Sequence, residues 1–121
     1  MTDYCLFTVE LKGARRIYIR GVANITEPVD EYEKIIEFYH GDELKKELPS
    51  NPYEPGSDDY KLFERLLEII RTDFERFGDE LVFAKEKEET LNYMGEDFIL
   101  NIQKVTIDWT PINFIKCIYI Q

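Results

Sequence analysis

The amino-acid sequence predicts an α+β fold, with an antiparallel sheet of about five strands and one long and one or two shorter helices packed on it. Apolar residues alternate with a period of two in the first part and the last third of the chain, and a long stretch of helical period lies between them. Strands and helices do not alternate, which argues against a parallel sheet. With 121 residues the chain can form one hydrophobic core, so we expect a single domain over residues 1–121.

The first strand is predicted over residues 3–11, because every second residue from Cys5 to Leu11 is apolar. The Lys-Gly-Ala segment after it supplies a turn with a glycine that accepts positive φ. Residues 15–23 would then return as the second strand of a hairpin, with isoleucines on one face and basic and aromatic side chains on the other.

A helix is expected between Thr26 and His40. Thr26 is a suitable N-cap, apolar residues then recur at helical spacing, and Gly41 supplies a stop directly after His40. A shorter helical piece is expected from Asp42 onward until Pro49 ends it.

The longest helix is predicted after a loop at 49–57, which contains three prolines and a glycine and displays Tyr53. Ser57 or Asp58 would cap this helix, and Gly78 would end it. Its apolar stripe follows the i, i+3, i+4, i+7 rule for four turns: Phe63, Leu66, Leu67, Ile70, Phe74 and Phe77.

The last third of the sequence is typical of strands. Residues 80–86 alternate, and a hairpin is expected over 89–107 with its turn at Gly95 and Glu96. Residues 112–120 are apolar on both faces, which fits either a central strand or a dimer interface. The order of the strands in the sheet stays open.

The sequence offers little for catalysis. Glu37 and His40 have the Glu-x-x-His spacing of di-iron bundles, but the chain has one copy, and its single histidine cannot supply a zinc site. Cys5 and Cys117 lie in apolar segments, where thiols are buried and unreactive. We therefore expect no catalytic residue, metal or cofactor, and we interpret His40 as a helix C-terminal residue that suits the helix dipole.

Charge is distributed unevenly along the chain. The formal net charge is −10, with −13 over residues 27–97 and +3 over the rest. A strongly negative protein repels nucleic acid and anionic membranes, so we expect neither as a direct partner. No apolar run is long enough for a membrane span, no signal-peptide layout is present, and there are only two cysteines, so we expect a cytoplasmic protein.

Tyrosines are interleaved with the unbalanced acidic residues between positions 30 and 60. Acidic groups speed association with a basic partner, and tyrosines supply anchoring contact area. We therefore predict a partner-binding surface formed by Glu33, Glu37, Tyr39, Asp42, Glu43, Tyr53, Glu54, Asp58 and Asp59.

Such a surface is typical of small inhibitors that occlude a basic, nucleic-acid-processing enzyme, such as nuclease immunity proteins, antitoxins and phage anti-defence proteins. We expect this function, without catalysis by the protein itself. One alternative is a homodimeric structural or accessory protein that assembles through its C-terminal strand. The other is an enzyme that binds a small ligand or a metal with His40 and nearby carboxylates.

One basic and aromatic stripe stands apart from the acidic residues. It consists of Arg15, Arg16, Tyr18 and Arg20 on the second predicted strand. On a strand face this stripe could hold a phosphate or a base. It could equally be the solvated side of a hairpin, or pair with acidic residues of the same chain.

Overall fold

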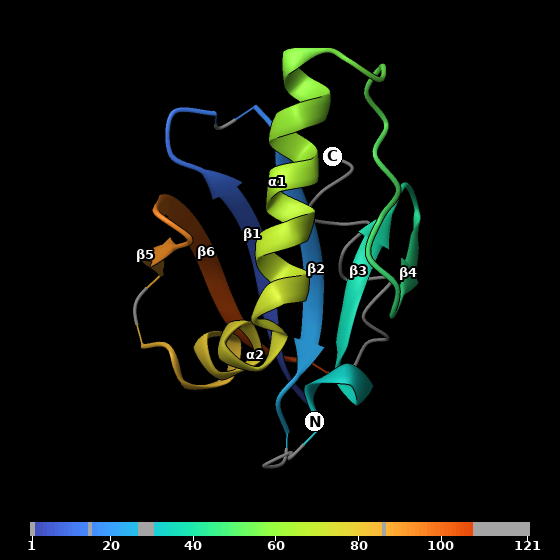
Figure 1. Cartoon of the computed structure of the whole chain (residues 1–121). Helices are drawn as coiled ribbons and strands as arrows, with labels where there is room; N and C mark the ends of the chain where they lie inside the picture. The colour runs from blue at the N-terminus through green and yellow to red at the C-terminus, as the bar shows by residue number, and fades with distance from the viewer. Residues whose placement is uncertain (1, 15, 27–30, 86, 108–121) are drawn as a thin grey trace.

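The computed structural model of the chain describes residues 2–14, 16–26, 31–85 and 87–107. Within them, six strands form one antiparallel sheet in the order β4-β3-β2-β1-β6-β5, and two α-helices lie on one face of it (Figure 1). The elements are β1 (Thr2–Leu11), β2 (Tyr18–Asn24), the 3-10 helix η1 (Tyr32–Lys34), β3 (Ile36–His40), β4 (Glu43–Lys45), α1 (Asp58–Thr72), α2 (Phe74–Phe83), β5 (Glu88–Tyr93) and β6 (Glu96–Ile107). The predicted α+β class is confirmed, with six strands where about five were expected.

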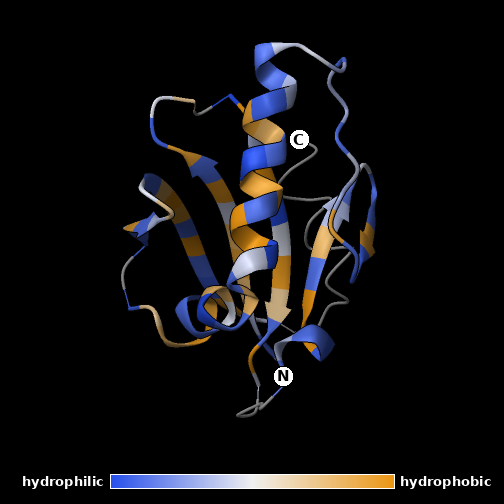
Figure 2. Ribbon diagram, in the orientation of Figure 1, coloured by the Kyte–Doolittle hydropathy of each residue, from blue (hydrophilic) through white to orange (hydrophobic). Residues whose placement is uncertain are grey.

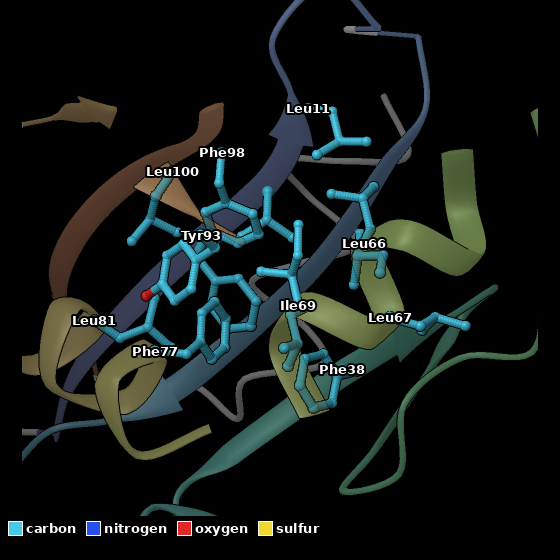
Figure 3. Packing of buried hydrophobic residues seen from close by; sticks show 14 of the residues in the cluster. Leu11, Phe38, Leu66, Leu67, Ile69, Phe77, Leu81, Tyr93, Phe98 and Leu100 are labelled. Carbon is cyan, nitrogen blue, oxygen red and sulfur yellow. The ribbon is translucent and has the colours of Figure 1, made fainter. Parts of the chain in front are cut away.

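The main core lies between the helices and the sheet. Apolar residues alternate with polar ones along the strands, and α1 carries both kinds (Figure 2). Phe38 of β3, Phe77 of α2 and Phe98 of β6 project into the same space (Figure 3). Gly21 of β2 is paired with Phe7 of β1, and a β-carbon on Gly21 would lie 2.9 Å from a ring carbon of Phe7, so this position requires a residue without a side chain.

The predicted N-terminal hairpin is confirmed by β1 and β2, which pair from Tyr4 opposite Asn24 to Glu10 opposite Tyr18. The odd-numbered apolar residues of β1 belong to the core under the helices. Its even-numbered residues face the other side of the sheet, where Leu6 lies in a second, smaller apolar cluster. Both faces of β1 are therefore buried, as expected for a strand in the middle of a sheet.

The helix predicted between Thr26 and His40 is wrong. After the short η1, the chain enters strand β3, which is followed directly by β4, so the shorter helical piece expected from Asp42 is wrong as well. Gly41 has a φ of 64° and opens a two-residue turn between the two strands. A glycine with positive φ serves either a helix end or a tight hairpin, and here it serves the hairpin.

The long helix is confirmed but divided. Asp73 interrupts it with φ −135° and ψ 59°, and the Asp73 carboxylate accepts a hydrogen bond from the backbone N–H of Arg76 at the start of α2. The strand predicted over 80–86 is wrong, because α2 continues to Phe83. Gly78 lies inside α2 and does not end it.

The C-terminal hairpin is confirmed by β5 and β6, with its turn one residue earlier than expected, at Met94 and Gly95. Within the described ranges no helix is long and apolar enough to cross a membrane. The strand expected over 112–120 lies outside the described residues.

Candidate functional site

A pocket forms where β2 and β3 separate. The two strands pair only from Gly21 opposite Phe38 to Ala23 opposite Ile36, and beyond Gly21 they diverge. The space between them has a volume of about 390 Å³. This volume lies within the range of pockets that hold small molecules.

The walls of this pocket, which we call the β2–β3 pocket, come from four elements. Tyr18, Ile19 and Arg20 of β2 line one side, and Tyr39, His40 and Gly41 line the other. The loop before α1 and the first turns of α1 close it from the helix side with Pro49, Ser50, Pro52 and Phe63. Because Tyr18 and Arg20 alternate with Ile19 along β2, the lining includes residues that belong to both faces of the sheet.

The residues that line the pocket combine buried apolar side chains with an arginine and two tyrosines. Ile19 and Phe63 are buried in the core. The guanidinium of Arg20 lies 4.4 Å from the ring centroid of Tyr18 and donates a hydrogen bond to the Tyr18 hydroxyl. Stacking of this kind restricts the guanidinium to one orientation.

His40 lies at the end of β3 and not at a helix C-terminus, which corrects its sequence interpretation. Its Nε2 atom is 2.7 Å from the backbone oxygen of Glu47. A carbonyl oxygen only accepts, so Nε2 carries the hydrogen in this contact. In the part of the chain that the structure describes, no three histidine, cysteine or carboxylate side chains are grouped as metal ligands.

The basic and aromatic stripe is divided between two roles. Arg16 forms an ion pair with Asp59 at the start of α1, with 2.7 Å between the nitrogen and oxygen atoms. Tyr18 and Arg20 line the β2–β3 pocket. Arg15 lies outside the described residues.

The predicted partner-binding residues do not form one continuous surface. Glu33 belongs to η1, which precedes β3, whereas Asp42 and Glu43 lie in and after the turn at the other end of β3. Glu37 and Tyr39 lie between them on the strand itself. The residues around the β3–β4 turn are therefore close together, and Glu33 is a strand length away from them.

The remaining four predicted residues lie on the loop before α1 and on its first turn. The ring of Tyr53 packs on Phe63, with the ring centroids 5.9 Å apart, so it contributes to the core more than to a partner surface. Glu54 is exposed on the loop, and Asp58 is exposed at the first position of α1. Pro52 of this loop and Gly41 of the β3–β4 turn line the same pocket, which brings the two acidic segments to one end of the molecule.

Two of the predicted acidic residues are engaged within the chain. Asp59 forms an ion pair with Arg16, and the Glu43 carboxylate lies 3.6 Å from the Lys45 ammonium nitrogen. The other five predicted carboxylates form no ion pair with a described residue: Glu33, Glu37, Asp42, Glu54 and Asp58.

Cys5 is the described cysteine, and it is fully buried in β1. Burial raises the pKa of its thiol to about 12, and the charge of Lys104 only partly opposes this effect. A thiol that stays protonated is a poor nucleophile. The expectation that Cys5 is buried and unreactive therefore agrees with its surroundings, and Cys117 lies outside the described residues.

Sequence reasoning missed the β2–β3 pocket as a unit. The sequence predicts Arg20 on a strand and His40 at a helix end, so neither position indicates that the two residues line one pocket. What brings them together is the pairing of β2 with β3, which depends on contacts distant in sequence. The basic and aromatic composition of the second strand was the one local signal.

The chain matches no protein-family model, no curated protein and no solved structure. Its function is therefore inferred from its own residues.

Proposed function

We propose that this protein is a small acidic cytoplasmic inhibitor that binds a basic, nucleic-acid-processing enzyme and occludes its substrate site. The observation that carries the proposal is the set of unpaired carboxylates at one end of the molecule. Asp42 of the β3–β4 turn follows the lining residue Gly41, Glu54 lies two residues after the lining residue Pro52, and Asp58 is the first residue of α1. None of the three forms an ion pair with a described residue. We call these three residues the acidic end.

Unpaired carboxylates are available to a partner without first breaking an internal contact. Asp59 and Glu43 would have to give up Arg16 and Lys45, which reduces what they can contribute to binding. The net charge of −10 would attract a basic protein over a distance and accelerate the encounter. The same charge gives the protein little affinity for the nucleic acid that its partner binds.

The inhibitor would act by covering a surface and not by chemistry. The enzyme's cationic substrate groove would face the acidic end, so that carboxylates occupy the positions of substrate phosphates. Tyr39 of β3 is half-buried beside the β3–β4 turn and offers an aromatic contact for the centre of such an interface.

The proposal can be tested with a charge variant that leaves the fold intact. Asp42→Asn, Glu54→Gln and Asp58→Asn together neutralise the acidic end, and all three side chains are exposed. Immobilised wild-type protein should retain a basic enzyme from a lysate of its native host at moderate salt, and the triple variant should not.

The matched control neutralises three exposed carboxylates elsewhere: Glu33→Gln, Glu68→Gln and Glu75→Gln. This control changes the net charge equally and should retain the enzyme. If the control loses the enzyme as completely as the triple variant, general charge and not the acidic end explains the binding. If wild-type protein retains no basic enzyme, the proposal is wrong.

A further inference from the structure

We propose that the face of the sheet opposite the helices is a docking surface for the chain's own C-terminal segment, residues 108–121. This face, which we call the back face, consists of the even-numbered residues of β1 and the residues paired with them on β2 and β6. It shares no residue with the acidic end, so docking of the segment and capture of a partner can fail independently.

The centre of the back face is buried. Leu6 and Val22, which are paired across β1 and β2, are each 2% exposed, and Tyr4 beside them is buried as well. Glu10 is 5% exposed, and its partner Ile99 on β6 is also buried. An antiparallel sheet can leave one face to solvent, and a glutamate on such a face would extend into water. The burial of these residues therefore indicates a covering layer.

The described helices and loops do not supply this layer. Both α-helices lie on the opposite face, with the odd-numbered residues of β1 (Figure 1). The 3-10 helix η1 packs there through Tyr32, and the loop before α1 packs there through Tyr53 on Phe63. Side chains stand roughly perpendicular to a sheet, so neighbours within the back face contact Leu6 and Val22 only from the side.

The covering layer belongs to the same chain. Leu6 and Val22 are buried within a single copy, so a second copy is not the cause of their burial. Among the parts of the chain outside the described ranges, only residues 108–121 form a stretch longer than four residues. This segment contains four isoleucines and two charged side chains, Asp108 and Lys116, a composition that suits an apolar face.

The segment starts at the back face and is long enough to cross it. Strand β6 ends at Ile107, and Val105, two residues earlier, already packs against the cluster around Leu6. This cluster extends to Leu44 of β4, which is roughly 20 Å from β6 at about 4.8 Å per strand. Residues 108–121 would span about 20 Å as a helix and about 45 Å when extended, so either form reaches across β1 and β2.

Docking removes apolar surface from water on both partners. The exposed segment and the uncovered face would each form an apolar patch of the kind that drives self-association. When the segment lies on the back face, each buries the other, and this burial is favourable. Homodimerisation through the C-terminal strand would require the segment to leave its own back face.

The experiment is methyl NMR on the full-length protein with labelled isoleucine, leucine and valine methyl groups. The methyl groups of Leu6 or Val22 should show nuclear Overhauser contacts with isoleucine methyl groups of residues 112–120. In a mixture of labelled and unlabelled chains, an isotope-filtered spectrum should show no such contact between different chains. This second spectrum separates docking within one chain from docking between two copies.

A matched pair of variants tests which face holds the segment. Val22→Ala removes two methyl groups from the back face, and Val9→Ala removes two from the buried helix side of β1. Val22→Ala should accelerate amide hydrogen exchange of residues 112–120 at least about threefold, because it weakens the surface that holds them. Val9→Ala should leave their exchange unchanged.

The assignment would be overturned by any of three results. One is the absence of contacts from Leu6 and Val22 to residues 108–121 in the wild type. Another is that such contacts occur only between different chains, which would make a second copy the occupant. The last is that Val9→Ala accelerates exchange of the segment as much as Val22→Ala. The contacts in the wild type decide the matter if either variant fails to fold.

Discussion

Tyr32 of η1 lies against Gly78 of α2, so closely that a β-carbon on Gly78 would be 2.6 and 2.8 Å from two ring carbons of Tyr32. The Tyr32 hydroxyl also donates a hydrogen bond to Asp79. This contact fixes the segment that precedes β3 against the second helix. It also explains a glycine in the middle of α2, where helix propensity alone would disfavour it.

Gly78→Ala should destabilise the protein even though alanine is the better helix former. Alanine gains about 1 kcal/mol of helix propensity, but overpacking against the Tyr32 ring costs about 1–3 kcal/mol and the ring must move. Chemical denaturation would measure the difference. In a Tyr32→Ala background the same substitution should stabilise the protein, and destabilisation of equal size in both backgrounds would contradict the contact.

Met94→Asn should stabilise the β5–β6 hairpin. Met94 has a φ of 53° and the following Gly95 has a φ of 83°. Two consecutive residues with positive φ are what a type I′ turn requires. Asn-Gly is the preferred pair for this turn, so we expect a gain of about 0.5–1 kcal/mol in the free energy of unfolding. Met94→Val should lower it, because a branched side chain is strained at positive φ. Equal stability of both variants would show that the turn has another geometry.

Tyr93→Phe should leave the protein as stable or make it more stable. The Tyr93 hydroxyl is buried and has no hydrogen-bond partner among the residues that the structure describes, and an unsatisfied buried group costs about 1–3 kcal/mol. The Arg76 guanidinium, 4.2 Å from the ring centroid, can stack on either ring. Tyr32→Phe is the control that should lose stability, because it removes a hydrogen bond. A large loss in Tyr93→Phe would reveal a partner for its hydroxyl.

Alkaline pH should destabilise the protein through Cys5. The unfolded chain ionises this thiol near its ordinary pKa of 9.0, whereas burial raises the pKa of the folded state to about 12. Between these values the unfolded state binds fewer protons, so the free energy of unfolding falls as pH rises, by up to about 1.4 kcal/mol per pH unit for one group. Tyr93, whose pKa burial raises to about 12, adds to the fall above pH 10.

Denaturation of the wild type and of Cys5→Ala between pH 8 and pH 10 measures how much the thiol contributes to the pH dependence of the free energy of unfolding. Roughly one proton is released on unfolding in this range. The wild type should lose stability more steeply than Cys5→Ala. Parallel curves would mean that the thiol is not buried. Mass-labelling of the native Cys117→Ser variant gives a second measurement, since Cys5 should react only after unfolding.

The strands of the sheet's centre and the first long helix could be predicted because their signals are local and unambiguous. Alternation in β1 places Cys5 and Leu11 on the helix-facing side, and the apolar stripe that begins at Phe63 in α1 continues to Phe77 in α2. The segment from Ile36 to His40 was not predictable in this way. Ile36 and Phe38 suit a strand, while Ile35, Ile36 and Tyr39 suit a helix, and a short apolar run fits both periods.

The region around Leu81 shows the same limit. Leu81 and Phe83 would share one face of a strand, but Leu81 is fully buried and Phe83 is 69% exposed, as helical geometry requires. A glycine at position 78 can end a helix or allow an aromatic ring to pack closely against it. The choice depends on Tyr32, which lies 46 residues earlier in the sequence. The candidate site depended on such distant contacts even more, because Arg20 and His40 line one pocket only through the pairing of β2 and β3.

Inhibition of the captured enzyme tests the central claim most directly. The purified basic enzyme would be assayed on its nucleic-acid substrate with increasing amounts of wild-type protein or of the variant with a neutralised acidic end. Occlusion predicts that the wild type abolishes activity near equimolar amounts and that the variant requires at least about tenfold more, because each desolvated charge contact is worth a large factor in affinity. Full enzyme activity in the presence of excess wild-type protein, or equal inhibition by the variant, would contradict it.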